Sequence, residues 1–251
     1  MLEIKQLTVA ASDKNILTNV SFKAVQGKIT AIVGGSGCGK TTIANCVMRL
    51  LPSALKVTQG QIFFNQQDLL SLEKEEMRLL RGADIAMIFQ EPLWAFNPLM
   101  KIGQQMDEVL AVHTAMDKTG RRNKILDTLA RVQLSNASDI FNRYPHQLSG
   151  GQRQRAMIAQ ALVTNPKFMI ADEPTSNLDV TVQAKIMDLF REFKKEGLSM
   201  LLISHDLGLV SHLADDIVIL EDGKVVESGS VDAIMNKPSH KYTKALMEAF
   251  A

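Results

Sequence analysis

Residues 32–42 read Ile-Val-Gly-Gly-Ser-Gly-Cys-Gly-Lys-Thr-Thr, a glycine-rich loop that follows a short apolar segment and opens a helical pattern. Gly34, four further residues and then Gly39-Lys40-Thr41 match the P-loop pattern, in which backbone N–H groups wrap the α- and β-phosphates of a nucleotide. Glycine is needed there because the backbone turns sharply and no Cβ can stand between an amide and a phosphate. We therefore predict a phosphate site formed by Gly34, Gly35, Ser36, Gly37, Cys38, Gly39, Lys40, Thr41 and Thr42.

Lys40 and Thr41 carry the chemistry predicted for this loop. Lys40 would place a positive charge between the β- and γ-phosphates, the Thr41 hydroxyl would bind Mg²⁺, and the following helix N-terminus would add its partial positive charge. A flexible glycine loop is the alternative interpretation. The phosphate site is favoured by the buried-strand pattern of residues 28–33 before the loop and by the helical spacing of apolar residues after it, Ile43, Val47, Leu50 and Leu51.

The composition is nearly neutral, with 28 Lys and Arg against 27 Asp and Glu in 251 residues and a formal net charge of +1. A chain of this length can bury a full core, and we expect one composite domain. The charge balance argues against nucleic acid as the main partner. The first residues lack a secretory pattern and no apolar run approaches about 18 residues, so we expect a soluble chain, for which any membrane role would come through a partner.

Cys38 and Cys46 lie in and just after the glycine-rich loop. Their positions suit neither a disulfide nor a zinc site, which favours a reducing compartment. We expect Cys38 to fill space in the loop rather than to act in redox chemistry.

Periodicity predicts a small antiparallel sheet near the N-terminus and buried strands elsewhere. Residues 2–9 and 16–22 alternate in polarity, and a turn at Gln59-Gly60 followed by a strand to Asn65 can return to the same sheet. Further along, the pattern predicts a charged helix over 71–81, a helical stretch over 93–142 and two short helices over 231–250, broken at Pro238. It predicts a hairpin over 217–227 that turns at Asp222-Gly223. Buried strands are predicted at 85–89, 167–172 and 198–204.

Polar side chains follow three of these buried strands. Gln90 ends one, Asp172 and Glu173 end the next, and His205 ends the last. Nucleotides bind at the carboxyl ends of strands in open α/β sheets, so we expect these groups near the phosphates. Gln90 could contact Mg²⁺ or the attacking water.

Adjacent carboxylates on an extended segment point in opposite directions and therefore suit different tasks. Asp172 suits Mg²⁺, directly or through water, and Glu173 suits the general base that polarises water. Capping of the following segment is the structural alternative for the pair. His205 could donate to a γ-phosphate oxygen, although a lone histidine is more often structural. The catalytic candidates are Glu173, His205 and Gln90, and the metal candidates are Thr41, Gln90 and Asp172.

A second helix start follows Leu148 and reads Ser149-Gly150-Gly151-Gln152, a helix terminus that could bind an anion. One chain does not need two such sites for one γ-phosphate, unless the second serves a nucleotide on another subunit. On physical grounds alone, an ordinary loop before a helix is an equal alternative. Asp179 could cap the next helix and also serve a contact between subunits.

These motifs occur in the order and context of the ATP-binding subunits of ABC transporters, and the chain resembles that family from end to end. A P-loop alone would be equally consistent with GTPases and kinases. Those proteins lack a Leu-Ser-Gly-Gly-Gln motif between the strand that ends in Gln90 and the segment that contains Asp172 and Glu173. Within the family the chain looks most like the peptide/nickel import group. The marks of that group are Ile88–Pro92 with Phe96–Pro98, Tyr144-Pro145, Asp179–Ala184 and His240–Leu246.

The resemblance implies an α/β fold with a RecA-like P-loop NTPase core, an N-terminal antiparallel β subdomain and an inserted α-helical subdomain. It implies one ABC ATPase domain over residues 1–251. Within it, 1–90 and 161–235 form the nucleotide-binding core with the β subdomain, 91–160 the helical signature subdomain, and 236–251 a C-terminal helix.

The resemblance also implies roles for single residues and for partners. ATP and Mg²⁺ would bind at Gly34–Thr42, and Ser149, Gly150, Gly151 and Gln152 would reach the γ-phosphate held by the opposite subunit. Asp179 would lie at the dimer contact, Gln90 would sense the membrane subunit, Glu173 would be the base and His205 the γ-phosphate switch. Two ATP molecules would be sandwiched between an identical or paralogous pair of ATPase subunits packed head to tail, on the cytoplasmic face of the membrane. The partners implied are transmembrane permease subunits and, indirectly, an extracytoplasmic substrate-binding protein.

Three departures from the family pattern affect these expectations. Residues 10–15 lack the aromatic ring that the family usually stacks on adenine, and Asn177 stands where a small apolar residue is common. Longer peptide-importing members carry a cysteine-containing C-terminal extension, and this sequence stops at Ala251, which leans toward nickel or metal-chelate import.

The sequence thus predicts an ATP-hydrolysing subunit that powers an importer of nickel, metal chelates or small peptides. A nucleic-acid-associated ATPase of repair or chromosome type is the alternative, but it would need a long coiled-coil insertion or a basic stripe, and the sequence contains neither. A non-hydrolytic nucleotide sensor is a second rival, which Glu173 and His205 argue against.

Overall fold

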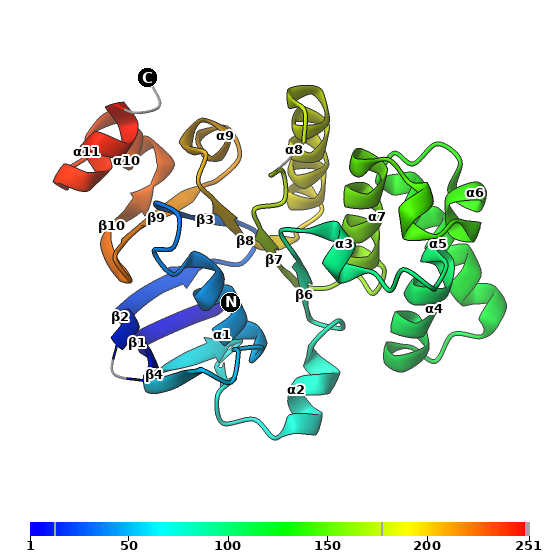
Figure 1. The fold of residues 1–251 in the computed structure, drawn as a ribbon, viewed down its shortest axis with the longest axis horizontal. Coiled ribbons are helices and arrows are strands. Elements are labelled where there is room, and N and C mark those ends of the chain that lie inside the picture. Colours follow the sequence, from blue (N-terminus) through cyan, green and yellow to red (C-terminus); the bar gives the residue numbers. More distant parts are fainter. Residues whose placement is uncertain (13, 177, 249–251) are drawn as a thin grey trace. The chain divides into compact units, whose positions relative to one another are not determined.

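The computed structural model describes residues 1–12, 14–176 and 178–248, and the chain divides into two compact units (Figure 1). The first unit comprises Met1–Met77 and Lys194–Ala251, and the second comprises Arg78–Phe193. Asn177, for which the sequence analysis noted a departure, lies outside the described residues, as does the predicted helix end at 249–250. The domain boundaries proposed from the sequence stay a prediction.

An antiparallel sheet in the order β2-β1-β4-β5 begins the first unit (Figure 1). Its strands are β1 (Leu2–Ala11), β2 (Lys14–Ala24), β4 (Leu55–Phe64) and β5 (Gln67–Asp68). The predicted antiparallel pairing is confirmed, since β1 pairs with both β2 and β4. Apolar side chains at alternate positions bury one face, as the alternating pattern requires.

The predicted turn at Gln59-Gly60 is wrong, because β4 already begins at Leu55 and runs through both residues. The pairing of β1 with β4 shifts register between Lys5 and Thr8, and Gln6 has a φ of 49° there. Gly60 has a φ of 99°, and a Cβ on it would lie 2.6 Å from the Gln6 carbonyl oxygen. The glycine therefore marks a bulge inside a strand, which a turn signal resembles in sequence.

A second set of strands in the first unit carries the glycine-rich loop. The strands β10, β9, β3 and β8 lie side by side in that order, with β3 (Ile29–Val33) parallel to β8 (Ser199–Ser204) and to β9 (Asp216–Glu221). All residues of β3 and β8 are buried, which explains their continuous apolar runs. The hairpin of β9 with β10 (Lys224–Ser230) is confirmed, and its turn residues Asp222 and Gly223 have φ values of 45° and 74°.

Short helices complete the first unit. They are α1 (Lys40–Met48), α9 (Leu207–Ser211), α10 (Val231–Asn236) and α11 (Lys241–Glu248). The last two confirm the predicted pair of helices broken near Pro238. The charged helix expected at 71–81 is α2 (Lys74–Leu80), at the division between the units.

The second unit combines a parallel strand pair with helices. β6 (Ile85–Ile88) pairs with β7 (Phe168–Asp172), both fully buried. The helices are α3 (Pro92–Ala95), α4 (Ile102–His113), α5 (Lys118–Arg131), α6 (Ala137–Asn142), α7 (Gly150–Leu162) and most of α8 (Val180–Lys195), with a 3₁₀ turn at Pro145–Gln147. Helices α4, α5, α6 and α7 pack on one another, which confirms the helical stretch predicted for 93–142. Among the described residues, no helix is both long and apolar enough to cross a membrane.

Candidate functional site

The loop between β3 and α1 has the geometry of a phosphate cradle. Gly37 and Gly39 have φ values of 78° and 108°, a region that side chains rarely adopt. At Gly34 a Cβ would lie 2.1 Å from the Leu220 carbonyl oxygen, so only glycine fits. Ser36 and Gly37 are exposed at the tip of the loop, where their backbone N–H groups can meet an anion.

Lys40 lies over this loop rather than in solvent. Its side chain is buried, and its ammonium donates to the carbonyl oxygens of Gly34 and Gly35 at 2.9 Å each. The positive charge therefore stays within the loop that would hold the phosphates. Thr41, the next residue, is exposed at the first turn of α1, so its hydroxyl can meet a ligand.

Cys38 is a buried residue of the loop and Cys46 a buried residue of α1; neither forms a disulfide. Burial raises the pKa of the Cys38 thiol, and it raises the pKa of Cys46 to about 12. Both thiols are therefore protonated near neutral pH and poor nucleophiles. The geometry favours the expectation that Cys38 fills space.

The loop and His205 lie at one edge of the first unit's second sheet. Register places Val33, the last residue of β3, beside Ser204, the last residue of β8. Gly34 and His205 therefore leave neighbouring strands at the same level. His205 is exposed, and the next residue, Asp206, caps α9 by accepting from the Leu209 N–H at 2.9 Å.

Gln90 and Glu173 come together in the second unit. β6 and β7 run parallel with Ile88 beside Ala171, so both polar residues follow strand ends on the same edge. The Gln90 Nε2 donates to the Glu173 Oε2 at 3.1 Å. The predicted base is thus oriented by the residue that the sequence assigned to water or metal.

The backbone at Glu173 is strained, since its φ is 45°. A left-handed conformation in a non-glycine residue costs on the order of 1–3 kcal/mol and persists only where the surroundings hold it. Here the carbonyl oxygen of Glu173 accepts from the Ser176 hydroxyl at 2.9 Å and from the Ser176 N–H at 3.1 Å. Asp172, the last residue of β7, is only 2% exposed. The two carboxylates therefore occupy different environments, as adjacent residues with separate tasks require.

Two glutamines that the sequence analysis missed hold the loop after Glu173. The amide of the buried Gln154, on α7, donates to the Pro174 carbonyl oxygen at 2.6 Å. The amide of Gln183, on α8, donates to the carbonyl oxygens of Thr175 and Leu178 at 3.1 and 3.2 Å. The signal for Gln154 was available, because it shares a helical face with the apolar Met157 and Ile158, where an uncompensated amide would be costly.

The predicted signature residues form the N-terminus of α7. Ser149 and Gln152 make a capping box, in which the Ser149 Oγ accepts from the Gln152 N–H at 3.3 Å and the Gln152 Oε1 accepts from the Ser149 N–H at 3.1 Å. A Cβ on Gly151 would lie 3.0 Å from Val182 of α8, whereas a Cβ on Gly150 would have no atom within 4 Å in the part of the chain that the structure describes. Packing in this chain therefore explains the glycine at 151 but not the glycine at 150.

Asp179 is an exposed residue that caps α8, with its Oδ1 accepting from the Val182 N–H at 2.9 Å. The capping role expected from the sequence is confirmed. The intersubunit role stays a prediction.

The three residues predicted to bind Mg²⁺ all have side-chain oxygen atoms. A hydroxyl from Thr41, an amide oxygen from Gln90 and a carboxylate from Asp172 are oxygen ligands of the kind that this ion takes, together with phosphate oxygens and water. The first of these residues lies in the first unit and the others in the second.

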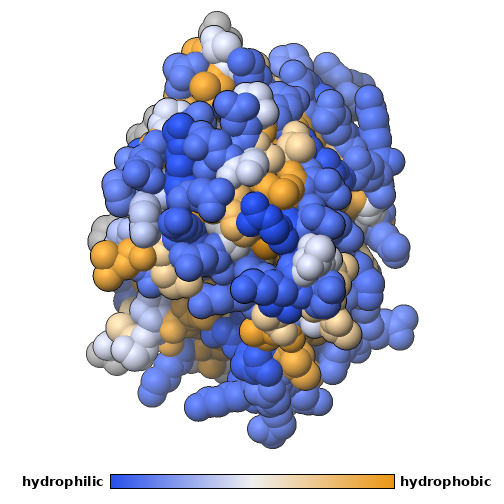
Figure 2. All heavy atoms as spheres, turned by 90° about the vertical axis from the view of Figure 1, so that its right-hand side faces the viewer, coloured by the Kyte–Doolittle hydropathy of each residue, from blue (hydrophilic) through white to orange (hydrophobic). Residues whose placement is uncertain are grey.

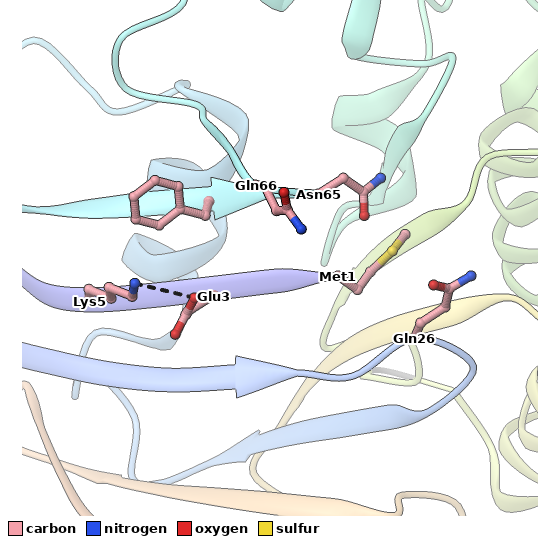
Figure 3. A pocket seen from close by; sticks show the side chains of 7 residues that line it. Met1, Glu3, Lys5, Gln26, Asn65 and Gln66 are labelled. Carbon is pink, nitrogen blue, oxygen red and sulfur yellow. Dashed lines mark ion pairs between the residues drawn. The ribbon is translucent and has the colours of Figure 1, made fainter.

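A hollow in the first unit is shown in Figure 3. It has a volume of about 500 Å³ and is lined by Met1, Glu3, Lys5, Gln26, Phe63, Asn65 and Gln66. Lys5 and Glu3 form an ion pair at 3.5 Å, and the Lys5 ammonium lies 4.8 Å from the centre of the Phe63 ring. None of the lining residues is a predicted site residue.

Comparison with known proteins places these motifs in context. A family model described as "ABC transporter" matches residues 17–176. The dipeptide transport ATP-binding protein DppD of Bacillus subtilis (strain 168) is 46% identical over 230 residues, which cover 91% of this chain and 69% of DppD. The oligopeptide transport ATP-binding protein OppD of Lactococcus lactis subsp. cremoris (strain SK11) is 41% identical over 255 residues, covering 99% of this chain and 75% of OppD.

Solved structures of ABC transporter cassettes also match this chain. The dimeric structure of MJ0796, a bacterial ABC transporter cassette, superposes with a TM-score of 0.82 at 29% identity over 92% of this chain and 99% of that chain. A dimeric post-hydrolysis structure of the same cassette, bound to ADP and Pi, matches equally well. These matches confirm the α/β fold class predicted from the sequence.

Proposed function

This chain belongs to the ABC transporter family, and from that membership we propose that it is the ATP-hydrolysing subunit of a membrane importer of peptides. The chain is an ATPase of the family's ATP-binding type. The individual site residues, the Mg²⁺ ion, the partners and the cargo belong to the proposal.

The observation that carries the catalytic part is the Glu173 carboxylate, held by the Gln90 amide at 3.1 Å on a strained backbone. A carboxylate oriented by an amide donor can accept a proton from water while that water attacks the γ-phosphate. The loop at Gly34–Thr42 would bind the phosphates and Lys40 would stabilise their charge. Mg²⁺, when bound, would neutralise charge on the β- and γ-phosphate oxygens, and Thr41, Gln90 and Asp172 would hold it.

The open space at Gly150 supports a site completed by a second ATPase subunit. Gly150 is exposed at a helix N-terminus, and no atom of the described residues would lie within 4 Å of a Cβ placed there. An anionic group from outside the chain could therefore approach the backbone N–H groups of α7 closely. We propose that this group is the γ-phosphate of an ATP held by an identical or paralogous subunit.

Peptides are proposed as cargo because two of the similar proteins are named as dipeptide and oligopeptide transport ATP-binding proteins. The nickel or metal-chelate cargo expected from the sequence stays an untested prediction. The proposed partners are transmembrane permease subunits, served by an extracytoplasmic substrate-binding protein, with this chain on the cytoplasmic face. A nucleic-acid-associated ATPase is not favoured, since the relatives described above are named for transport.

The segment after Gln90 is the proposed contact with the permease. Leu93 and Leu99 are 52% and 84% exposed, and such side chains on the segment that follows Gln90 can pack against a partner. Movement of that partner could then displace Gln90 and with it Glu173. Figure 2 shows the side of the molecule that lies on the right in Figure 1, where hydrophilic side chains dominate and apolar ones form patches between them.

Substitution of Glu173 by Gln tests the proposal. The variant keeps the size of the side chain but cannot act as a base, so we expect ATP binding to persist while turnover falls at least about a hundredfold. ATP that is bound but not hydrolysed should also stabilise a dimer, which light scattering detects. Glu192→Gln, an exposed carboxylate on α8, is the matched control and should behave as wild type.

The same pair of variants tests the cargo in cells that lack the native gene. Wild type and Glu192→Gln should restore uptake of a labelled dipeptide, and Glu173→Gln should not. Near wild-type hydrolysis by Glu173→Gln would contradict the base assignment. Restored uptake of labelled nickel without dipeptide uptake would contradict peptide import, and ATPase activity stimulated by DNA would support the nucleic-acid alternative.

A further inference from the structure

The segment His240–Leu246 was noted in the sequence only as a mark of a subgroup. In the first unit it lies against the glycine-rich loop at Gly34–Thr42, called the phosphate loop below. The Tyr242 hydroxyl oxygen accepts a hydrogen bond from the Gly35 backbone N–H at 2.8 Å. More than 200 residues of sequence separate the two, so no local pattern predicts this contact. A Cβ on Gly35 would lie 3.3 Å from the same hydroxyl, which leaves little room for a side chain there.

One peptide plane of the loop is held from both sides. The N–H of the Gly34–Gly35 peptide donates to Tyr242, and its carbonyl oxygen accepts from the Lys40 ammonium at 2.9 Å. Rotation of this peptide would break both hydrogen bonds at once. Tyr242 therefore fixes the orientation of the group that positions Lys40, and hydrogen bonds in such a chain strengthen one another.

The helix that carries Tyr242 is itself anchored. The Glu227 carboxylate, on β10, accepts from the Ser239 N–H and hydroxyl, both at 2.8 Å, and from the His240 N–H at 3.1 Å. Burial alone would raise the pKa of Glu227, but hydrogen bonds donated by the 239–243 segment outweigh it and lower the pKa to about 2. Thr243, next to the tyrosine, is fully buried. The start of α11 is thus tied to β10 on one side and to the phosphate loop on the other.

We propose that Tyr242 is a positioning residue for ATP binding, and that Glu227 and α11 act through it to hold the phosphate loop in its binding conformation. Tyr242 acts on the nucleotide only through the Gly34–Gly35 peptide and Lys40. The inference rests on the phosphate loop binding nucleotide, which is part of the proposed function, and it is independent of the cargo.

Tyr242→Phe in the full chain tests this role, because it removes only the hydroxyl. With a fluorescent ADP analogue as probe, we expect the Kd to rise about five- to tenfold, since the Gly35 N–H loses its partner. At saturating ATP kcat should fall less than twofold, so the effect lies in KM. Lys244→Ala, an exposed position on the same helix, is the matched control and should bind as wild type.

A merely structural role for Tyr242 predicts a different result. It would lower the melting temperature without changing the Kd of the folded protein, and that outcome would overturn the proposal. A Kd for Tyr242→Phe within twofold of wild type would also overturn it. Glu227→Gln should also raise the Kd. Glu227→Asp should bind more tightly than Glu227→Gln, because a shorter carboxylate can still accept hydrogen bonds from the 239–240 segment. Full affinity in Glu227→Gln would contradict the part assigned to Glu227.

Failure here is distinguishable from failure of the proposed function. If wild type itself does not bind the ADP analogue at the phosphate loop, nucleotide binding at Lys40 is wrong and the positioning role falls with it. If wild type binds and Glu173→Gln behaves as proposed, equal affinity in Tyr242→Phe rejects only the role of Tyr242.

Discussion

Single residues decide which substitutions the two segments predicted to bind phosphate can tolerate. Gly34 is confined by the Leu220 carbonyl oxygen and Gly151 by Val182, so these glycines have packing reasons within the chain. Gly150 has none, although it belongs to the same motif. Open space at Gly150 is what the proposed approach of a phosphate from another subunit would require.

Gly150→Ala separates the two kinds of requirement. Alanine at this position, in the first turn of α7, would meet no atom among the described residues, so we expect the free energy of unfolding to stay unchanged or rise by up to about 1 kcal/mol. ATPase activity should nevertheless fall at least about tenfold if a phosphate of another subunit approaches this backbone. Thermal melting and steady-state ATPase assays measure the two effects.

Gly229→Ala is the control for this comparison. It lies in β10, where a Cβ would make ordinary contacts at 3.6 Å and longer, and it should change neither property appreciably. Unchanged ATPase activity in Gly150→Ala would contradict the approach of an external phosphate to α7.

Elements of the fold are tied together by hydrogen bonds that cross long stretches of sequence. Glu227 on β10 holds the start of α11, and Gln154 on α7 holds the loop that carries Glu173. In each case a polar side chain of one element forms hydrogen bonds with backbone groups of another segment. Such ties make the position of a short element depend on one side chain.

The tie at Glu227 predicts a pH dependence of stability. Its pKa is lowered from 4.5 to about 2 in the folded chain, so its contribution is fully present above about pH 4.5. The contribution is lost as the pH falls from 4.5 through 2, because the carboxylate becomes protonated and no longer accepts charge-assisted hydrogen bonds. Wild type should therefore melt at a higher temperature than Glu227→Gln at pH 6, and the difference should shrink below pH 4.5.

Glu248→Gln, an exposed carboxylate on α11, provides the comparison and should follow wild type at every pH. A gap between wild type and Glu227→Gln that stays constant from pH 6 to pH 3 would show that the charge of Glu227 does not hold α11.

Much of this element structure was predictable from sequence, for identifiable reasons. The buried strands β3, β6, β7 and β8 appear as continuous apolar runs, and the Asp222-Gly223 turn has the residues that positive φ favours. The turn expected at Gln59-Gly60 failed because a bulge glycine and a turn glycine look alike without knowledge of the partner strand. Contacts such as Tyr242 with Gly35 depend on which distant segments meet, and periodicity carries no information about that.

At the scale of the whole molecule, the predicted catalytic groups divide between the two units. The phosphate loop and His205 belong to the first unit, and Gln90, Asp172, Glu173 and the signature residues belong to the second. The sequence located these segments because each follows a recognisable strand or opens a recognisable helix. The resemblance assigned the signature residues to the nucleotide of a neighbouring subunit, and that assignment stays a prediction.

Dependence of activity on protein concentration tests that assignment. If each nucleotide is completed by a second subunit, the ATPase rate per chain should rise with chain concentration and level off when the dimer is saturated. Dilution series of wild type, with light scattering at each concentration, measure the rate and the association together. Adding Lys40→Ala chains, which keep an intact signature segment, to dilute wild type should raise the rate per wild-type chain.

A rate per wild-type chain that stays constant on dilution to a monomer would contradict the shared site. Lys40→Ala chains that give no stimulation at concentrations where they associate with wild type would do the same.

The hairpin tip at Asp222-Gly223 has a further consequence. The Gly223 N–H donates to the Cys38 carbonyl oxygen at 3.1 Å, its own carbonyl oxygen accepts from the Thr18 N–H at 2.8 Å, and a Cβ on it would lie 2.2 Å from the Ile16 carbonyl oxygen. Hairpin tips are ordinarily where an epitope tag or a fluorescent label can be inserted with little harm. In this protein the tip contacts both β2 and the phosphate loop, so an insertion that lengthens it should abolish the enzyme's activity.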